Sequence, residues 1–591
     1  MATERPSARW LGSLARHRPL PVACGLLAVL LTLPALGAGL IADDYFHRMI
    51  LLGTPDGGSA PPPLRSLFSF IPEGRQEFMM DAGYLPWWSD PGIHIAFSRP
   101  LTALTHVADY ALWPDRLALQ HLHSLAWLLA GVALVASLYR KIHGATLTAA
   151  LAAVFFAIED AHALPAGWLA NRNGLICLVA GTGVILLHLA WRRRPSPWRL
   201  LLALAVLGVG LGCGEATVGA LAYVAAWQLT EKGTPWLRRL APLVPYGLVV
   251  LAWRAIYVSM GYGTRGSSLY VDPGGQPFPF LLALAERWPI LVLGQWLQLP
   301  IDLWLILPRV AQLVLAVVAV IVTAVVAALL WPLLRKERLA RFWVLGMGLA
   351  MIPVCAAFPM DRLLVFAGIG AFGALAMLLE SVGAWPWGPA RGARWRRGAA
   401  WLLLIIHGPI AASLLVARTA ALPLWGNIFS MGAEAGPAEP EVAGQTFVFV
   451  NGNDFPVVYT RLIRLIGGEA PAPRRVVQLG AMTTVNTVHR EDERTLVITS
   501  RGGFLALYVD RLLASPERSF DVGERIERPD YVAEIRSITP DGRPSVVAFR
   551  FRTPLEHRGL RWLYWKDAEL VEFPLPGVGE HVVVEASFGF H

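Results

Sequence analysis

Charged residues are scarce in this chain. Asp, Glu, Lys and Arg make up 16% of the 591 residues, whereas 55% are hydrophobic, and the mean hydropathy is +0.49. This composition excludes an ordinary soluble domain and indicates a protein that crosses a membrane several times. The net charge of +9 does not indicate nucleic-acid binding, because the basic residues cluster in short segments between apolar stretches, as they do in loops that flank membrane spans.

Cysteine is rarer still. The chain has four cysteines, and each lies in an apolar stretch: Cys24, Cys177, Cys213 and Cys355. The sequence therefore predicts neither a disulfide framework nor a metal cluster, and we expect no metal and no cofactor. Lysine is scarce as well, with only four of the 51 basic residues. This bias toward arginine is common in GC-rich bacterial genomes and hints at a bacterial source.

Long apolar stretches fill the first 420 residues. They lie at 21–42, 119–139, 146–158, 173–191, 199–212, 214–230, 240–260, 308–334, 341–358, 362–382 and 398–418. If all eleven cross the membrane, every arginine-rich loop falls on the cytoplasmic side together with the N-terminus. The loops at 43–118, 159–172, 261–307 and 359–361 then fall outside. This agreement tests the count, because one missed span would reverse the charge bias of every later loop.

The character of the sequence changes after residue 420. Residues 421–444 are rich in Gly, Pro, Ala and Glu, which predicts a linker. Residues 445–591 alternate apolar and polar residues in short runs such as QTFVFVNG and RTLVITS, and turn signals interrupt them; this pattern predicts β-strands. We therefore expect a cytoplasmic N-terminus (1–20), a polytopic α-helical transmembrane domain (21–420) and a β-rich periplasmic domain (445–591), in a bacterial cytoplasmic membrane.

Two adjacent acids, Asp43 and Asp44, directly follow the first apolar stretch. That stretch is long for a signal peptide and ends without an A-x-A motif, so we expect a retained anchor. Carboxylates at a membrane edge lose hydration, which is unfavourable unless another group uses them. They indicate an acid/base site at the boundary between water and lipid. The alternative is that they only mark where the helix leaves the membrane.

Further polar residues fall on the same expected outer face. The candidate substrate-binding residues are Arg99, His121, His123, Glu159, Asp160, His162, Arg172, Glu215, Arg254 and Arg362. Arginine and histidine can neutralise a phosphate leaving group, and a carboxylate can deprotonate an incoming hydroxyl, so this set suits a phosphate-linked lipid substrate.

Each of these residues also has a purely structural interpretation. Arg99, Arg172 and Arg254 are also suited to anchoring helix ends at the interface, and His121 and His123 to capping a helix there. Glu215 could instead form a buried ion pair with Arg254. The tryptophans Trp87 and Trp88 are expected to belong to an interfacial aromatic belt.

The order of these motifs resembles the GT-C glycosyltransferases, in particular the protein O-mannosyltransferase-like branch that includes the transmembrane tetratricopeptide O-mannosyltransferases. The resemblance rests on the acidic pair at 43–44, Arg99-Pro100-Leu101 with the histidines that follow, the segment 154–175, Cys213-Gly214-Glu215, and Asp361-Arg362-Leu363. Together these cover roughly residues 20–380. The chain has residues other than those usual in the family at several of these positions: Glu159-Asp160, Leu164, Gly214, Leu363 and Val365. No tetratricopeptide repeat follows.

The resemblance implies an inverting transfer of a sugar from a polyprenyl-phosphate-linked donor to an acceptor hydroxyl. Asp43 would act as general base, and Asp44 would position the acceptor or tune its neighbour. Arg99, His123, Arg172 and Arg362 would bind the donor phosphate without a metal. The partners implied are the lipid donor, membrane lipids and an acceptor of unspecified chemistry. The β-rich domain is expected to be a sandwich-like module that helps to bind that acceptor.

Two other functions fit a polytopic chain. A transporter or flippase of a lipid-linked substrate would place its charges at mid-depth and show internal repeats. A non-catalytic scaffold that displays the β-rich domain would need no cavity. Catalysis, by contrast, requires the charged residues to gather at the outer rim around a cavity, so the position of the charges distinguishes the three functions.

Overall fold

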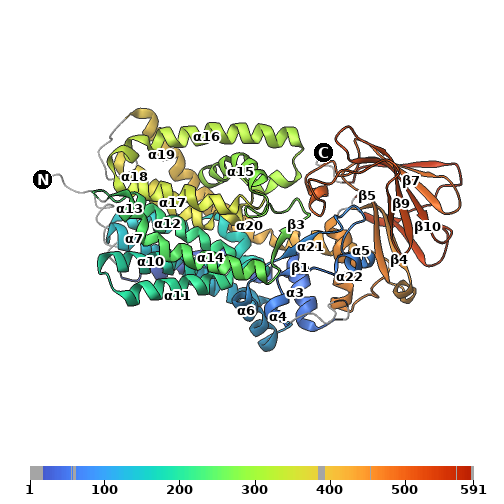
Figure 1. The fold of residues 1–591 in the computed structure, drawn as a ribbon, viewed down its shortest axis with the longest axis horizontal. Coiled ribbons are helices and arrows are strands. Elements are labelled where there is room, and N and C mark those ends of the chain that lie inside the picture. The colour runs from blue at the N-terminus through green and yellow to red at the C-terminus, as the bar shows by residue number, and fades with distance from the viewer. Residues whose placement is uncertain are drawn as a thin grey trace.

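The computed structural model describes residues 18–54, 56, 62–233, 235–383, 393–452, 454–567 and 569–587. A long helical bundle forms one part of the molecule, and a β-rich domain packs against one end of it (Figure 1). The bundle helices are α2 (Leu20–Leu31), α7 (Leu117–His143), α8 (Leu147–Ala157), α10 (Arg172–Arg193), α11 (Pro197–Cys213), α12 (Gly219–Leu229), α14 (Val244–Ser259), α15 (Pro277–Leu297), α16 (Arg309–Lys336), α17 (Arg338–Val354), α18 (Val365–Val382), α19 (Arg394–Ile405) and α20 (Ala411–Ala420).

The shorter helices lie mainly at the two ends of the bundle. They are α3 (Asp43–Leu52), α4 (Pro63–Ser66), α5 (Gln76–Ala82), α6 (Pro100–Leu112), α9 (Ala163–Gly167) and α13 (Trp236–Leu240). Three short strands of the same part, β1 (Ser69–Ile71), β2 (His94–Ala96) and β3 (Gly263–Arg265), form an antiparallel sheet in that order.

The number of spans is lower than the eleven expected. Among the described residues, seven helices are long and apolar enough to cross a membrane, or eight if the bent pair Leu147–Ala157 and Asp160–Gly167 is one span. The first apolar stretch is α-helical only as far as Leu31 and continues as a 3₁₀ turn, Leu33–Gly37, whose second residue is Pro34. α2 and α11 are also apolar, but they are shorter than the seven helices counted above. The fold class, a polytopic helical membrane protein with a C-terminal β-rich domain, is confirmed.

One long helix was not expected. α15 lies within 261–307, which the sequence predicted to be a loop, because prolines at 277, 279 and 289 and the charged pair Glu286-Arg287 interrupt its apolar pattern. Residues that flank it on both sides contact the β-rich domain. Gln276 Nε2 donates to Glu517 Oε1 at 3.0 Å, and the Trp304 ring packs 4.7 Å from that of Tyr508. The segment from Gln276 to Trp304, which contains α15, therefore begins and ends beside the β-rich domain.

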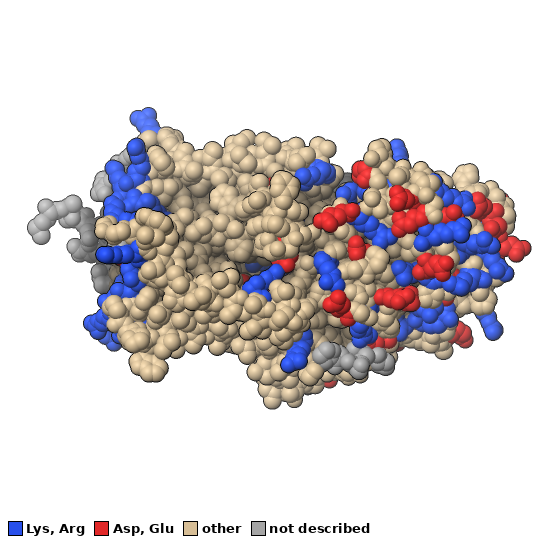
Figure 2. Space-filling view, in the orientation of Figure 1, with Lys and Arg blue, Asp and Glu red and all other residues tan. Residues whose placement is uncertain are grey.

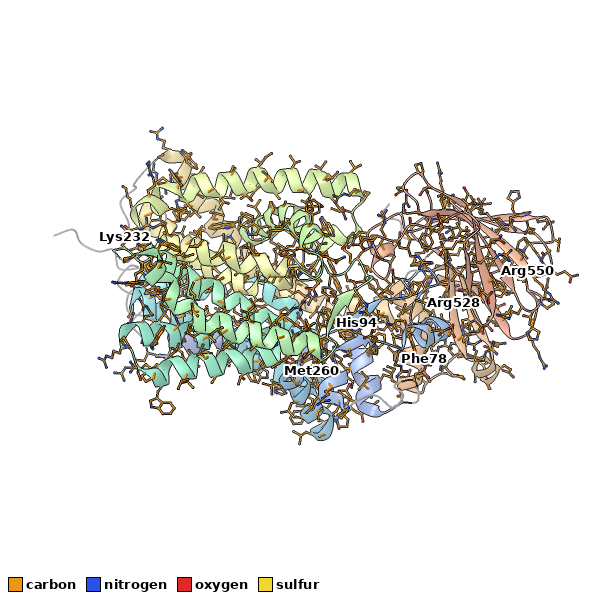
Figure 3. All side chains as sticks on the ribbon, in the orientation of Figure 1. Phe78, His94, Lys232, Met260, Arg528 and Arg550 are labelled. Atoms are coloured by element: carbon orange, nitrogen blue, oxygen red, sulfur yellow. The ribbon has the colours of Figure 1, made fainter. Side chains whose placement is uncertain are left out.

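The basic loops gather at the end of the bundle away from the β-rich domain, which we call the basic end (Figure 2). Hydrogen bonds join these loops to one another: Arg140 donates to the carbonyl of Arg18 at 3.1 Å, and Arg193 to that of Lys141 at 2.8 Å. Lys232 lies at the same end (Figure 3). The segregation of charge agrees with the predicted placement of the arginine-rich loops on one side.

This arrangement predicts a labelling pattern. The native cysteines in the described residues are all buried, so a single introduced cysteine gives a clean signal. In spheroplasts, Lys566→Cys in the β-rich domain should react with a membrane-impermeant maleimide. Arg194→Cys at the basic end should react only after permeabilisation. Both side chains are exposed. Labelling of both from the same side would contradict the predicted topology.

In its described residues, the β-rich domain has two sheets and one α-helix. Its elements are β4 (Thr446–Gly452), α22 (Asp454–Gly467), β5 (Arg475–Ala481), β6 (Asn486–Arg490), β7 (Thr495–Ser500), β8 (Arg525–Glu527), β9 (Tyr531–Ile538), β10 (Pro544–Phe551), β11 (Leu560–Lys566), β12 (Glu569–Glu572) and β13 (His581–Val584). The strand order is β13-β6-β7-β10-β9-β8 in an antiparallel sheet and β12-β11-β4-β5 in a mixed one.

Strand β4 lies between two layers. Phe447 and Phe449 share a core with Val457 of α22, while Val448 and Val450 share a core with the six-stranded sheet. β4 pairs in parallel with both β5 and β11, and its burial on both faces explains why its sequence is apolar without strict alternation. The domain is a two-sheet packing with a helix on one face.

The β-rich domain is built partly from the first large loop of the bundle. Trp87 and Trp88 are 2% and 1% exposed and belong to the core of the domain. Trp87 Nε1 donates to the carbonyl of Leu479 at 3.2 Å, and its ring packs 5.7 Å from that of Phe549. The expectation of an interfacial aromatic belt is wrong, because these side chains fill a protein core.

The segment predicted to be a linker is mostly helical. Helix α21 (Leu422–Glu434) begins with a proline in its first turn, a position at which the missing N–H has no helical partner to lose. Its Phe429 ring packs 5.2 Å from Phe455 and 5.1 Å from Tyr459, both on α22. A packed helix, rather than a flexible tether, thus connects the bundle to the β-rich domain.

Candidate functional site

Asp43 and Asp44 form the first turn of α3, at the junction between the bundle and the β-rich domain (Figure 1). Carboxylates are stabilised at a helix N-terminus by the peptide dipoles. Ala42, which precedes them, has a φ of 47°, a left-handed conformation that is uncommon for a residue with a Cβ and is often found at functional sites. Of the two acids that follow this turn, Asp44 is buried and Asp43 is half-buried.

Asp44 is a structural residue in this geometry. It is 2% exposed, and its oxygens accept hydrogen bonds from the backbone N–H of Ala170 at 2.6 Å and of Ile41 at 3.0 Å. Burial raises the pKa of Asp44 to about 8, although these two donors favour its charged form. Asp44 therefore fixes α3 to the loop before α10 and holds its neighbour in place.

Asp43 is half-buried, and none of the described residues donates a hydrogen bond to its carboxylate or forms an ion pair with it. Burial raises the pKa of Asp43 to about 6, while the positive charges of Arg362 and Arg99 hold it down. The group is therefore mostly ionised at neutral pH, with both oxygens available to accept a proton.

Arg99 lies just before α6, and its charge counteracts the effect of burial on the pKa of Asp43. Its Nε donates to Glu215 Oε2 at 2.9 Å, and its guanidinium lies over the rings of Phe97 at 4.6 Å and Phe68 at 5.1 Å. The alternative pairing of Glu215 with Arg254 is wrong, because Arg254 forms a bidentate contact with Asp272 at 2.7 and 2.9 Å.

Arg362 lies just before α18, and its charge also counteracts the effect of burial on the pKa of Asp43. Its Nη1 donates to Asn171 Oδ1 at 3.3 Å, and its guanidinium lies 5.1 Å from the centre of the Trp168 ring. Among the described residues, no carboxylate comes within 4 Å of it. Its Nε donates to the Met360 sulfur at 3.2 Å. An amide, a thioether and an aromatic ring leave the charge of Arg362 uncompensated, which suits an anionic ligand.

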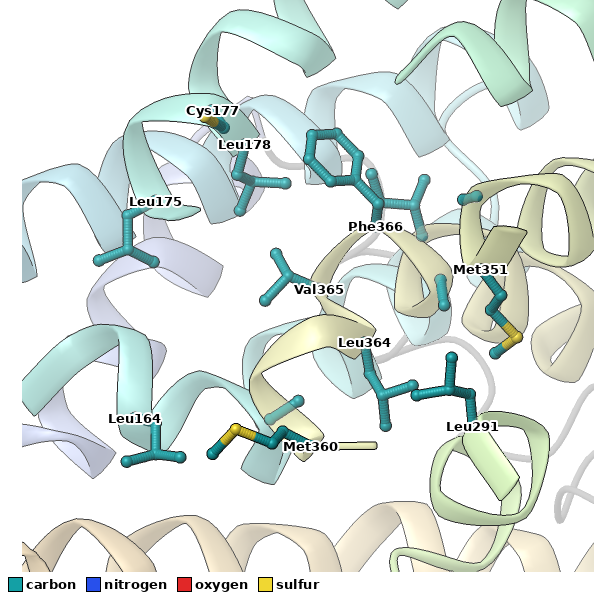
Figure 4. Close-up of a cluster of buried hydrophobic side chains, with 14 of the residues drawn as sticks. Leu164, Leu175, Cys177, Leu178, Leu291, Met351, Met360, Leu364, Val365 and Phe366 are labelled. Carbon is teal, nitrogen blue, oxygen red and sulfur yellow. The ribbon is translucent and has the colours of Figure 1, made fainter. Parts of the chain in front are cut away.

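The start of α18 holds Arg362 in position. The three residues that follow Leu363 pack into the bundle core: Leu364, Val365 and Phe366 lie among Leu175, Leu178, Leu291 and Met351 (Figure 4). The Phe366 ring also fills the space left by two glycines, since a Cβ on Gly181 or Gly219 would lie 2.7 or 3.1 Å from it. This packing restrains the backbone from which Arg362 projects.

Tyr270 completes the site and was not identified from the sequence. Burial raises the pKa of its hydroxyl, the charges of Arg362 and Arg99 lower it, and those of Asp43 and Glu215 raise it further. Tyr270 thus lies among the other four residues. It comes from the loop before α15, where no local pattern marks it. We call Asp43, Arg99, Glu215, Tyr270 and Arg362 the acid–arginine cluster.

Arg172 and His123 belong to a separate, buried cluster around Asp109 of α6. Arg172 is 0% exposed; its Nη1 lies 2.5 Å from Asp109 Oδ2, and its Nη2 donates to the carbonyl of Gln120 at 2.8 Å. His123 Nδ1 lies 2.7 Å from Asp109 Oδ1, and its Nε2 accepts a hydrogen bond from Trp127 at 3.1 Å. These contacts join α6, α7 and α10.

The remaining candidate residues lie apart from the acid–arginine cluster. His121 and His162 donate to the carbonyls of Gly39 at 2.9 Å and Phe156 at 2.7 Å. Glu159 is buried and accepts a hydrogen bond from Gln295 at 2.6 Å. Asp160 lies 3.2 Å from Arg418, which also contacts Asp361. In the part of the chain that the structure describes, no group of three or more His, Cys, Asp or Glu side chains could hold a metal ion.

No family model and no curated protein matches the chain. Among solved structures, the chain is similar to ArnT from Cupriavidus metallidurans bound to undecaprenyl phosphate, at 15% identity, over 78% of this chain and 89% of that one, with a TM-score of 0.34. It is also similar to the Archaeoglobus fulgidus oligosaccharyltransferase tethered to an acceptor peptide, at 11% identity, over 79% and 64%, with a TM-score of 0.37. These scores are low, so the function of this chain has to be inferred from the contacts of its site residues.

Proposed function

We propose that this protein is a membrane glycosyltransferase. It moves a sugar from a polyprenyl-phosphate-linked donor to an acceptor hydroxyl at the end of the bundle that carries the β-rich domain. The observation that supports this most is the setting of Asp43, a half-buried carboxylate without a hydrogen-bond partner among the described residues, which lies in the field of two arginines. A base and a cationic phosphate site side by side are what such a transfer requires.

In the proposed reaction, the acceptor oxygen attacks the anomeric carbon of the sugar. The bond between that carbon and the phosphate oxygen breaks, and the phosphate leaves with the electron pair. The acceptor proton passes to Asp43. A single displacement of this kind inverts the anomeric centre. The pKa of Asp43, raised by burial to about 6, lies near the pH at which a general base works well.

The two arginines have different parts in the proposal. Glu215 already balances the charge of Arg99, so we assign Arg99 the role of shaping the site and favouring the charged form of Asp43. The described partners of Arg362 are uncharged, namely the Asn171 amide, the Met360 thioether and the Trp168 ring, so it is the residue that we expect to contact the departing phosphate. Asp43, Arg99, Glu215 and Arg362 come from four separate segments of the chain. We expect the donor phosphate and the acceptor hydroxyl to meet where these segments come together.

The β-rich domain supports the helix that carries the base. The Tyr459 ring on α22 packs 6.0 Å from Tyr45 and 5.5 Å from Phe46, both on α3. Nearby, Arg461 forms a bidentate contact with Asp56 at 2.8 and 3.0 Å. We therefore assign the domain a second task besides acceptor binding: it holds α3 against the bundle.

Replacement of Arg362 tests the proposal. Arg362→Gln should lower transfer from a polyprenyl-phosphate sugar by about 10²–10³-fold, as removal of one group that stabilises a developing anion does. The measurement is transfer of radiolabelled sugar by the purified full chain. Arg265→Gln is the matched control, because Arg265 is exposed and paired with Glu73 outside the cluster, and it should retain activity. Normal transfer by Arg362→Gln would exclude this residue from donor binding.

A further inference from the structure

A large groove opens on the lipid-facing side of the bundle, and the proposed reaction does not use it. It has a volume of about 1290 Å³ and lies between α15, α16, α17 and the end of α12. α15 and α16 lie beside each other along one side of the bundle (Figure 1). A groove of this size in the hydrocarbon region would be filled by lipid.

The lining of the groove has a basic part and an apolar part. Four basic side chains, Lys232, Arg239, Arg335 and Arg341, line it at the basic end. Farther along α17 the lining is apolar and reaches Ile352. The twelve residues from Arg341 to Ile352 rise by about 16 Å, which is roughly half of a hydrocarbon core of about 30 Å. The groove therefore spans one leaflet.

The charge at the mouth of the groove remains positive. The acid that lines it, Glu231, is paired with Arg192 at 3.0 Å. Arg341 donates to the backbone carbonyl of Leu334 at 2.7 Å, and Arg335 lies 5.7 Å from the centre of the Trp331 ring. These contacts orient both guanidinium groups without neutralising them.

We propose that this groove binds one anionic phospholipid from the leaflet at the basic end. Its phosphate contacts Arg335 and Arg341, and its acyl chains lie along α17 and against α15. The site is distinct from the acid–arginine cluster, which lies at the other end of the bundle beside α3, so this inference goes beyond the proposed function. The occupant is a membrane phospholipid rather than the sugar donor, because the donor phosphate is expected at Arg362.

Native mass spectrometry of the detergent-solubilised full chain tests this site. With dioleoylphosphatidylglycerol and dioleoylphosphatidylcholine as competing probes, the wild type should retain the anionic lipid preferentially. Arg335→Gln with Arg341→Gln should weaken its retention by about fivefold for each charge removed. The control at the same end is Arg193→Gln with Arg194→Gln, which leaves the groove unchanged and should bind as the wild type does.

A groove-filling variant separates the apolar part of the site from its charge. Leu345→Trp places a large ring among the apolar lining and should reduce retention of the lipid, whereas Leu201→Trp on the exposed face of α11 should not. Equal retention of both lipids, or an equal loss in the Arg193/Arg194 control, would overturn the proposal. So would retention of undecaprenyl phosphate that depends on Leu345 but not on Arg335 and Arg341, because that result would assign the groove to the donor chain. Elution volume on size exclusion shows that each variant is folded.

Discussion

Asp43→Asn is expected to reduce sugar transfer by about 10²–10⁴-fold, the usual contribution of a general base. Asparagine keeps the shape of the side chain but cannot take up the proton of the acceptor hydroxyl. The protein should still fold, because Asp43 makes no hydrogen bond or ion pair with the described residues that the change would remove. The measurement is transfer by the purified, correctly inserted variant.

Asp44→Asn is the matched control for this change. The amide nitrogen that it introduces cannot accept the backbone N–H of Ile41 or Ala170, so the variant should lose about 1–3 kcal/mol of stability with a smaller effect on transfer. Near-normal turnover by Asp43→Asn would eliminate general-base catalysis by this residue, and a larger loss of transfer in the Asp44 variant would exchange the assigned roles.

The pH dependence gives an independent readout of the same group. The base must be deprotonated to act, and the pKa of Asp43 is about 6. Transfer should therefore be full above this pH and fall as the pH is lowered through it. The residual activity of Asp43→Asn should lack this acidic limb.

Several elements of the fold could be predicted because they follow from local patterns. The apolar stretches and the arginine-rich loops located most of the bundle, and the alternating runs located the strands of the C-terminal domain. α15 could not be predicted in this way, since its prolines and the Glu286-Arg287 pair lower its mean hydropathy to 1.3 in the best window, against 3.2 for α16. Its charges are satisfied by α16 and by neighbouring backbone, for instance by Arg309 at 2.6 Å from Glu286.

The candidate site could be predicted only in part, because residue contacts across the chain leave no local signal. The motif order brought Asp43, Arg99, Glu215 and Arg362 to attention, and the structure places these four together. Tyr270 joins them from a loop without a motif. Trp87 and Trp88 show how a local pattern can mislead. Paired tryptophans near apolar stretches are typical of an interfacial belt, but Trp87 binds Leu479, which lies 392 positions farther along the chain.

Removal of Asp109 is expected to destabilise the protein more than any of the other substitutions. Asp109→Ala leaves the guanidinium of Arg172 fully buried without its carboxylate partner, and breaking a buried ion pair from one side costs about 3–5 kcal/mol. His123 also loses the acceptor of its Nδ1. Thermal unfolding of the detergent-solubilised protein should show a large fall in Tm.

The double variant Asp109→Leu with Arg172→Met decides what Arg172 does. If the pair only joins α6, α7 and α10, apolar residues of similar volume should restore much of the lost stability, because no buried charge is left alone. Sugar transfer should return with the fold. If Arg172 instead binds the donor phosphate, as the family resemblance implies, the double variant should be stable but inactive. The contacts of its guanidinium with Asp109, Ser124 and the carbonyl of Gln120 favour the first outcome, since they hold all three of its nitrogens within the bundle.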